Sequence, residues 1–532
     1  MAVHAKANAK ISSRFSGRWK MEKVVRRLII RGIPFSLLLI TLVLFTVELR
    51  SDTVQSDQWK KQRWHKSGIE DQETLGEKQR AEKNQVGSRI EDDQEIVKVK
   101  QKTNWGGSRI EDQQMVQDES HAEVKELQDS LFERLVTGES RTQLEATGFA
   151  CHSDIHTEVF VSNRQVRIDT RTMKIYTPFS TNQTTHMTRP YPRREDQTAM
   201  DYVSPVQIIQ GDIDPPPACH YTHNVPAVVF SSGGFTGNIF HEFNEVIIPL
   251  FLTTRHFQSH LRFVITDFRP QFVAKFRKVL SHLSSYEVIN PAANESVHCF
   301  PGAVVGLHYH DNMAVKTTGF VPEGYSMLDF MKFLRHSFDL KARDLPQTEK
   351  PVLVLISRPR TRMFLNEDQL VAMMKALGYK VVIARPDMMV DVEIFAEVMN
   401  SCNVLVGAHG AGLTNEIFMP QGSVMVQVVG LNLEWASTAY YGGPAIEMGL
   451  HYIEYKIEPE ETSLISLYGK DDPIITDPAS VDKEKGYRFG RAVYLEQQSF
   501  NISLVRFGKT LVQALELLGR SAPSRGRKSV FR

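Results

Sequence analysis

Residues 404–429 read VLVGAHGAGLTNEIFMPQGSVMVQVV, and this stretch decides the fold class of the chain. The apolar run at its start and the run 424–429 at its end have the length and the β-branched content of buried strands. Between them lie a glycine-rich loop and the opening of a short helix near Thr414. A strand, a loop, a helix and a further strand in this order predict a parallel sheet covered by helices.

The same alternation extends to both sides of this stretch. Upstream, we predict strands at 352–358 and 380–384, with a helix between them that Asn366 caps and Gly378 ends. An earlier series has strands at 227–230, 261–267, 286–289 and 303–307 and helices at 239–254 and 272–283, after a hairpin at 157–169 and a strand at 174–179. The sequence therefore predicts two α/β lobes, 148–345 and 346–520, with a ligand cleft between them at the carboxyl ends of the strands.

The loop after the predicted strand NVLVG, residues 403–407, has the composition of a phosphate site. Glycines let backbone N–H groups approach an anion, and the N-terminus of a helix attracts negative charge. The spacing is not GxGxxG and there is no Walker lysine, so neither a dinucleotide nor a P-loop site is indicated. Arg358, Arg360 and Arg362 follow a strand of the same lobe, and guanidinium groups suit a diphosphate. We expect a nucleotide sugar as the ligand. The alternatives are that the glycine-rich loop is only a tight turn and that the arginines are only solvated surface residues.

A second motif is HEFNE, residues 241–245, which follows the glycine-rich stretch SSGGFTGN. His241 and Glu245 are four residues apart, so on a helix they share a face and can act as a general-base pair. A zinc-protease site requires a second histidine where Glu245 stands, and a polar helix start is the plain alternative. Asp212 and Asp214 form a DxD pair that we weigh as a metal site against a turn before three prolines.

The N-terminal region has the pattern of a membrane anchor. Residues 1–27 carry eight basic side chains and one acid, and 28–47 form an apolar run interrupted only by Arg31. We expect an uncleaved transmembrane signal anchor at 28–47, with the tail 1–27 in the cytosol and the rest of the chain on the lumenal side. Residues 48–147 are polar and contain a degenerate repeat, which predicts a disordered stem. A helix is expected near its end, where Val124, Leu127, Leu131 and Leu135 recur at helical spacing, and we interpret it as a short self-association seam. Residues 521–532 form a basic tail.

The overall charge gives no reason to expect nucleic acid as a partner, since 63 basic residues face 62 acidic ones. Sequons at Asn182, Asn294 and Asn501 fit a secretory lumen, and these asparagines are candidate glycosylation sites. The four cysteines, Cys151, Cys219, Cys299 and Cys402, permit two disulfides in three pairings. We expect at most one bridge, with Cys402 as a buried free thiol.

Four ordered motifs, GGFTGNIFHEFNEVIIPLF, LISRPRTRMFLNE, LVGAHGAGLTNEIFMPQGSVMVQV and YYGGPAIEMGLHYIEY, together resemble plant glycosyltransferases of family 61, the group with xylan arabinosyltransferases and xylosyltransferases. The resemblance covers about residues 151–518. It implies a GT-B-like fold of two Rossmann-like lobes, a Golgi type II membrane protein and an inverting transfer of a pentose from a UDP-sugar to xylan in the cell wall. It also implies no metal and no other cofactor.

The resemblance assigns roles to positions of this chain. Either His241 or Glu245 is implied as the catalytic base. The donor-binding set is Arg358, His409, Gly410, Ala411, Gly412, Leu413, Thr414 and Asn415, and Gly237, Asn238 and Glu242 are expected at the acceptor or in the cleft. Both arabinofuranosyl and xylosyl transfer remain open. The alternatives are xylosyl or GlcNAc transfer to a glycoprotein and a catalytically silent Golgi scaffold with partners bound through the stem.

Overall fold

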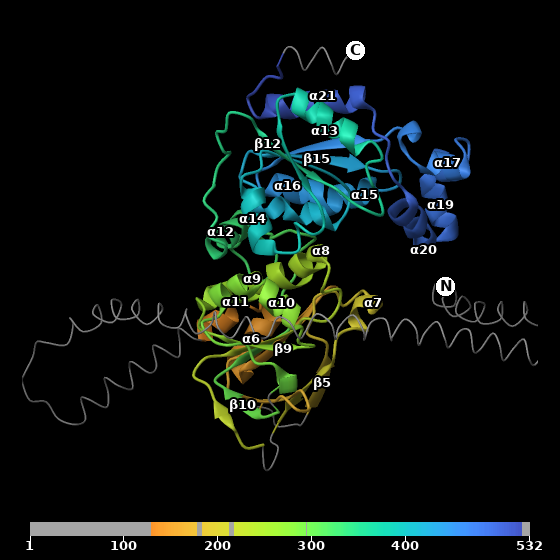
Figure 1. Cartoon of the computed structure of the whole chain (residues 1–532). Helices are drawn as coiled ribbons and strands as arrows, with labels where there is room; N and C mark the ends of the chain where they lie inside the picture. The colour runs from red at the N-terminus through yellow and green to blue at the C-terminus, as the bar shows by residue number, and fades with distance from the viewer. Residues whose placement is uncertain (1–128, 178–183, 212–216, 294, 524–532) are drawn as a thin grey trace, which may run out of the picture. The chain divides into compact units, whose positions relative to one another are not determined.

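The C-terminal part of the chain is built on a five-stranded sheet in which all strands run parallel. This is a computed structural model that describes residues 129–177, 184–211, 217–293 and 295–523 (Figure 1), all within one compact unit, Gln113–Arg532. The strands of this sheet are β12 (Val352–Ile356), β13 (Lys380–Ala384), β14 (Val404–Ala408), β15 (Val424–Val429) and β16 (His451–Lys456). Their order across the sheet is β13-β12-β14-β15-β16.

Helices cover both faces of this sheet, as Figure 1 shows for α13 and α21 on one side and α14 and α16 on the other. Leu353 and Leu355 of β12 pack with α13 (Glu367–Ala376) and α21 (Leu504–Leu517). Val354 and Ile356 point to the opposite face, where α14 (Val392–Asn400) and α16 (Gly443–Glu447) lie. This alternation is the two-residue period of a strand buried on both sides.

The order of the strands locates the ligand site. The chain moves from β12 outward to β13 and then returns to place β14 on the other side of β12, so the direction of winding changes between β12 and β14. In open α/β sheets, ligands bind at this switch point, beyond the carboxyl ends of the strands. The loops that follow β12 and β14 are the ones that carry Arg358 and His409.

The N-terminal part contains two sheets. One has the order β1-β2-β11-β8-β9, with strands Phe149–Ser153, Glu158–Ser162, Ala303–Val305, Ala227–Ser231 and Arg262–Thr266. Its last three strands are parallel, as predicted, whereas β1 and β2 are antiparallel additions. The other has the order β5-β6-β4-β3-β10-β7, with strands Thr184–Thr188, Val206–Gln210, Lys174–Thr177, Val166–Asp169, Val297–Phe300 and Tyr221–Thr222.

The second sheet replaces a layer of helices. One face of the first sheet packs on α9 (Ile248–Thr254), α10 (Pro270–Lys275), α11 (Arg277–Leu283) and α12 (Met327–Ser337). The opposite face, with Val229 and Val305, packs on Ile168 and Ile208 of the second sheet. The expected hairpin at Ser162–Asn163 is therefore wrong, because β2 and β3 belong to different sheets, and the N-terminal lobe has helices on one face only. The fold is mixed α/β and fits a Rossmann-like glycosyltransferase, most clearly in its C-terminal sheet.

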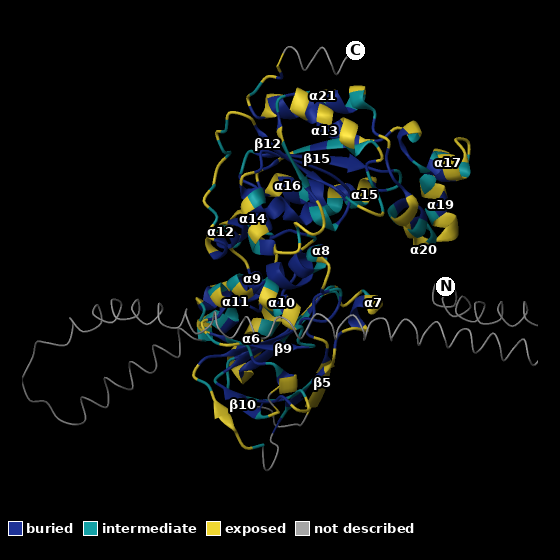
Figure 2. Cartoon of the chain, in the orientation of Figure 1, coloured by how far each residue is buried: buried dark blue, intermediate teal, exposed yellow. Residues whose placement is uncertain are grey.

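The folded region begins earlier than expected. Residues 129–133 are helical, α6 spans Gly138–Thr147, and Phe132, Leu135 and Leu144 are fully buried in the core. The end of the stem at residue 147 is therefore wrong by at least 19 residues, 129–147, because these apolar side chains are buried within the domain. Leu135 packs inside the domain and is not part of a self-association seam. Figure 2 shows how strands such as β9 and β15 are buried while the outer surfaces of α13 and α21 are exposed.

Other expectations have mixed outcomes. Cys219 and Cys299 form one disulfide, and Cys402 is a buried free thiol, as predicted. Gly378 ends α13 with a φ of +97°. Asn366 stands at the start of α13, but its side chain bonds the backbone of Ile502 instead of capping the helix.

Several expectations fall on residues that the structure does not describe. They are the tail 1–27, the anchor 28–47, the stem 48–128, Asn182, Asp212, Asp214, Asn294 and the end of the basic tail, 524–532. Within the described ranges, no helix has the length and apolar character needed to cross a bilayer. Asn501, the sequon that is described, is exposed.

Candidate functional site

The HEFNE motif lies on a helix that contains a wide turn. The helix is continuous through α8 (Ile239–His241), a π-helical segment η1 (Glu242–Ile247) and α9. Asn238 caps its start by accepting a 3.0 Å hydrogen bond from the N–H of Phe240. Pro249 has no N–H to donate to the preceding turn, and we attribute the widening to it. Such π segments occur frequently at functional sites.

His241 and Glu245 form a direct pair on this helix. Nδ1 of His241 lies 2.6 Å from Oε1 of Glu245. The Glu245 side chain is 0% exposed, whereas His241 is 22% exposed. Because Glu245 binds Nδ1, Nε2 is the ring nitrogen left to meet a substrate. The pair expected from the sequence is therefore present, with the histidine outward and the carboxylate behind it.

Two further donors hold the Glu245 carboxylate. Tyr191 donates from its hydroxyl to Oε2 at 2.5 Å, and Arg193 donates from a guanidinium nitrogen to Oε1 at 3.0 Å. Burial and the charge of Glu245 raise the pKa of Tyr191, so the phenol stays protonated and remains a donor. A buried carboxylate with three donors, one of them a cation, is compensated for its loss of water.

This arrangement contradicts the zinc alternative. Oε1 of Glu245 already receives both His241 and Arg193. A zinc ion bound there would have to displace a guanidinium whose own charge repels it. The residues present therefore fit an acid–base pair and do not fit a metal site.

The glycine-rich stretch before the helix makes room for Tyr191. Gly234 has a φ of +53°, and a Cβ on it would lie 2.3 Å from the Tyr191 ring. The N–H of Phe235 then donates to the Tyr191 hydroxyl at 3.3 Å. Only glycine combines this backbone conformation with this close approach. The GGF sequence thus positions Tyr191, whose hydroxyl donates to the carboxylate of Glu245.

Glu242 has a supporting position instead of the acceptor contact that the sequence predicts. It is 2% exposed, its Oε1 accepts from the N–H of Gly237 at 3.2 Å, and its Oε2 is paired with Lys275. These contacts fix the glycine-rich loop against α10, so a sugar cannot reach the carboxylate. Gly237 and Asn238 are exposed beside the helix start.

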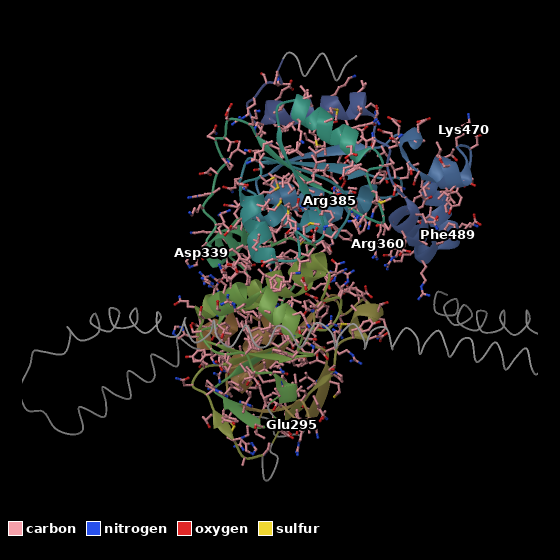
Figure 3. The ribbon with its side chains drawn as sticks, viewed as in Figure 1. Glu295, Asp339, Arg360, Arg385, Lys470 and Phe489 are labelled. Carbon is pink, nitrogen blue, oxygen red and sulfur yellow. A yellow bond between two sulfur atoms is a disulfide. The ribbon has the colours of Figure 1, made fainter. Side chains whose placement is uncertain are left out.

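Two arginines converge at the switch point of the C-terminal sheet. Arg358 bonds only the carbonyl and hydroxyl of Thr361, and neither Arg358 nor Arg362 forms an ion pair with any described carboxylate. Burial lowers the pKa of both, and for Arg362, which also lies near Arg358, to about 10. Two half-buried cations without a counter-ion make an anion site. Arg360, which is labelled in Figure 3, is exposed, so the alternative interpretation of this arginine as a solvated surface residue is confirmed.

His409 and Gly410 complete this site from the end of β14. Gly410 has a φ of +143°, and a Cβ on it would lie 2.6 Å from a guanidinium nitrogen of Arg358. Nδ1 of His409 lies 3.3 Å from the amide nitrogen of Gln427 and 3.4 Å from the Ser437 hydroxyl. Burial, Arg362 and Arg358 lower the pKa of His409 to about 3, so the ring is neutral at physiological pH. With Nδ1 accepting, Nε2 carries the hydrogen and can donate.

The rest of the predicted donor loop acts through its backbone. It forms a 3-10 helix, η4 (Ala411–Phe418), whose first N–H groups lie beside the arginines. Leu413 is fully buried and belongs to the core, Thr414 is buried next to Tyr441, and Asn415 donates to the Gly412 carbonyl at 2.9 Å. The Leu413 side chain therefore cannot contact a sugar donor. Ala411 and Gly412 are half-exposed.

Aromatic rings connect the His241 pair to the arginine site. The Phe240 ring lies 5.3 Å from the ring of His241 and 5.3 Å from that of Tyr440. Tyr440 and Tyr441 belong to a second π-helical segment, η5 (Thr438–Gly442), and their rings lie 6.4 and 5.5 Å from that of His409. A base candidate and an anion site are therefore connected through two successive aromatic side chains, Phe240 and Tyr440.

Several residues of this site were missed from the sequence. Tyr191 and Arg193 lie in the segment RPYPRRED, which has no strand or helix pattern to place it. Arg362 could not be separated from exposed Arg360 by spacing alone, since both follow the same strand. Tyr440 and Tyr441 were quoted in a motif without a role.

Comparisons with known proteins agree with this geometry. A family model described as "Glycosyltransferase 61" matches residues 218–426. The chain is 38% identical over 339 residues to "Alpha-1,3-arabinosyltransferase XAT2" of Oryza sativa subsp. japonica, which covers 62% of this chain and 57% of that protein. It is 33% identical over 346 residues to "Beta-1,2-xylosyltransferase XYXT1" of the same rice, covering 63% and 73%.

A relative in a dicotyledon is matched over a larger share of its length. "Xylan glycosyltransferase MUCI21" of Arabidopsis thaliana is 32% identical over 414 residues, which cover 74% of this chain and 84% of that protein. The chain thus spans little more than half of the rice arabinosyltransferase but most of the Arabidopsis protein. Together with the base pair, the anion site and the Rossmann-like sheet, these matches lead to one conclusion: the chain belongs to glycosyltransferase family 61.

Proposed function

We propose that the protein transfers a pentose, arabinofuranose or xylose, from a UDP-sugar to the backbone of xylan with inversion at the anomeric carbon. The names of the relatives above describe arabinosyl, xylosyl and xylan glycosyl transfer by those proteins, and they support a pentose donor and a xylan acceptor here. The observation that carries the proposal is the His241–Glu245 pair, held 2.6 Å apart and joined through Phe240 and Tyr440 to an anion site.

In this proposal His241 is the base, and its partial exposure beside a wholly buried Glu245 supports that choice. Nε2 of His241 takes the proton from an acceptor hydroxyl as that oxygen bonds to the anomeric carbon. The bond from this carbon to the diphosphate oxygen breaks at the same time, and UDP leaves with the electron pair. Glu245 is wholly buried and already accepts three hydrogen bonds, so it orients the ring and stabilises the imidazolium.

The leaving diphosphate is expected to bind at Arg358 and Arg362. Their unpaired guanidinium groups, the Nε2 hydrogen of His409 and the first N–H groups of η4 are the donors available. Two arginines supply positive charge where other glycosyltransferases use a metal ion, so we propose a reaction that needs no metal. Full activity in the presence of EDTA is the expected result.

The larger organisation is part of the same proposal. We propose that the N-terminal lobe, which includes the folded residues 129–147 and ends at 345, and the C-terminal lobe 346–520 act as a GT-B-like pair, with the donor on the C-terminal lobe and the acceptor near the His241 helix. Residues 28–47 are proposed as the anchor of a Golgi type II protein, with the basic tail 1–27 in the cytosol. Exposed Asn501 then faces the lumen, where glycosylation takes place.

The decisive experiment incubates the full-length protein with xylohexaose and, separately, UDP-arabinofuranose, UDP-xylose, UDP-arabinopyranose and UDP-GlcNAc. Mass spectrometry should detect one added pentose from one donor. The His241→Ala variant should lose at least about 100-fold in turnover while its affinity for UDP is kept. Transfer from UDP-GlcNAc to a glycopeptide would instead support the glycoprotein reading. Binding of xylan without binding of UDP would support the scaffold reading.

A further inference from the structure

Trp435 is a large aromatic side chain left in solvent beside the site. It lies on α15 (Glu434–Ser437) and is 71% exposed. The chain has five tryptophans, and Trp435 is the one that falls in the described ranges. An exposed indole gains little from burial and contributes nothing visible to the core.

The indole is connected to the candidate active site through Tyr440. The rings of Trp435 and Tyr440 lie 5.6 Å apart in an edge-to-face arrangement. Tyr440 is half-buried and contacts Phe240, the neighbour of His241 in the sequence. Burial raises the pKa of Tyr440, and the charges of Arg193 and Glu245 also act on its hydroxyl. Trp435 and Tyr440, here named the aromatic platform, thus extend outward from the site.

We propose that the aromatic platform binds the acceptor by stacking on the pyranose rings of a neutral β-linked oligosaccharide. The inference rests on the proposed function and names the acceptor subsite of the same centre. A xylose ring carries no charge, has C–H groups on its faces and has hydroxyls at its edge. An aromatic face covers such a C–H face, while the edge hydroxyls remain in water.

The position of the platform favours the acceptor over the donor. Tyr440 is the member that lies near His409, whereas Trp435 stands farther out, in contact with Tyr440 and exposed to solvent. A polymer needs contacts beyond the residue that reacts, since a single sugar offers few groups to hold. Trp435 therefore meets a ring next to the one that receives the pentose, and Tyr440 lies closer to the reacting hydroxyl.

The test uses the fluorescence of the full-length protein, which does not depend on turnover. Xylohexaose should shift or quench tryptophan emission in the wild type, and this response should be absent in Trp435→Phe. In kinetic assays, Trp435→Ala should raise the acceptor KM about tenfold, equivalent to about 1.4 kcal/mol. Its kcat should stay within about twofold, and the Kd for UDP should be unchanged. Tyr221→Ala, which removes another exposed aromatic ring on β7, is the matched control and should behave as the wild type.

Each alternative has its own signature. A weaker Kd for UDP in Trp435→Ala would show that the indole stacks on the nucleobase, and a change of oligomeric state would show an interface between copies. Either result, or an unchanged acceptor KM, overturns the proposal. A wild type that binds xylohexaose through Trp435 but transfers no sugar would retain the platform and reject the proposed function.

Discussion

Arg193 donates a 3.0 Å hydrogen bond to the same oxygen of Glu245 that faces the His241 ring. Burial alone lowers the pKa of Arg193, yet the charge of Glu245 raises it above its ordinary value, so the cation is retained. The pair gives the buried carboxylate a fixed counter-charge that is independent of any substrate. The histidine is therefore oriented before an acceptor arrives.

Removing the carboxylate charge should impair the chemical step. Glu245→Gln keeps the shape of the side chain but leaves Arg193 with Asp196 as its remaining described carboxylate partner and the His241 ring without a strong acceptor. We expect kcat to fall by about 100-fold or more with the Kd for UDP unchanged. Single-turnover kinetics with a xylan oligosaccharide measures this, and a loss confined to acceptor KM would contradict the role given to Glu245.

Arg358 and Arg362 should both contribute to binding of the diphosphate. Neither has a carboxylate partner among the described residues, so their charge is available to the ligand. Arg358→Met and Arg362→Met should each weaken UDP about tenfold or more, as measured by calorimetry. Arg360→Met is the matched control, because Arg360 is exposed on the same loop. Equal effects at all three positions would indicate a diffuse field instead of a built site.

Gly234 and Gly237 both have a positive φ, but an added Cβ would clash with a neighbour only at Gly234. Alanine substitutions at the two positions therefore distinguish the effect of backbone strain alone from that of strain with a steric clash. Gly234→Ala places a Cβ 2.3 Å from the Tyr191 ring and should displace the hydroxyl that bonds Glu245. Gly237→Ala meets nothing within 4 Å although its φ is +110°. The second variant should lose only about 1 kcal/mol of stability. Gly234→Ala should lose stability and also lose activity per folded molecule. Thermal melts measure the first loss, and specific activity corrected for the folded fraction measures the second.

Acid should destabilise the fold through neutral buried histidines. Burial, with neighbouring cations or histidines, lowers the pKa of His308 and His409 to about 3 and of His256 and His310 to about 4. Below the unfolded value near 6.5, the unfolded chain binds protons that the folded chain does not. Stability is therefore fully present above pH 6.5 and is lost as the pH falls toward 3 or 4. His308 alone should cost on the order of 2 kcal/mol at pH 5.

Thermal melts at pH 7 and pH 5 check this sign. His308→Asn should reduce the loss between the two pH values, even if its melting temperature at pH 7 is lower. Glu416 opposes the effect, because burial raises its pKa and the folded state keeps a proton that the unfolded state releases above pH 4.5. Glu416→Gln should therefore steepen the acid loss. A flat profile for Glu416→Gln, in which this opposing carboxyl is absent, would contradict the neutral state of the buried histidines.

Strands β12 to β15 of the C-terminal sheet were predictable because each is a short apolar run followed by a glycine or a polar loop, whereas β16 (His451–Lys456), in which polar residues alternate with apolar ones, was not predicted. Most strands and helices from 352 to 429 lie where periodicity places them. The pairing of a strand with its neighbours was not predictable in the same way. Strands β2 and β3 follow each other in sequence, yet they belong to different sheets. Pairing depends on long-range packing that a local pattern does not contain.

The site was predictable where its chemistry lies on one helix or one loop. His241 and Glu245 were found because helical geometry brings positions i and i+4 together. Tyr191 and Arg193 contact Glu245 from more than 50 residues away in the chain, and no sequence spacing predicts these contacts. Arg362 was passed over because its burial depends on a positive φ of 53° that sequence does not reveal.

The buried position of Phe132 and Leu135 shortens the distance that can separate the folded domain from the proposed anchor. Residues 129–147 are folded into the domain and are not available as tether. An extended chain spans at most about 3.5 Å per residue, so the maximum reach of the catalytic domain from the proposed anchor is shorter by about 65 Å than a stem ending at residue 147 would allow. A soluble enzyme cut at residue 148 would also lack part of its own core, and one that begins before residue 129 would keep it.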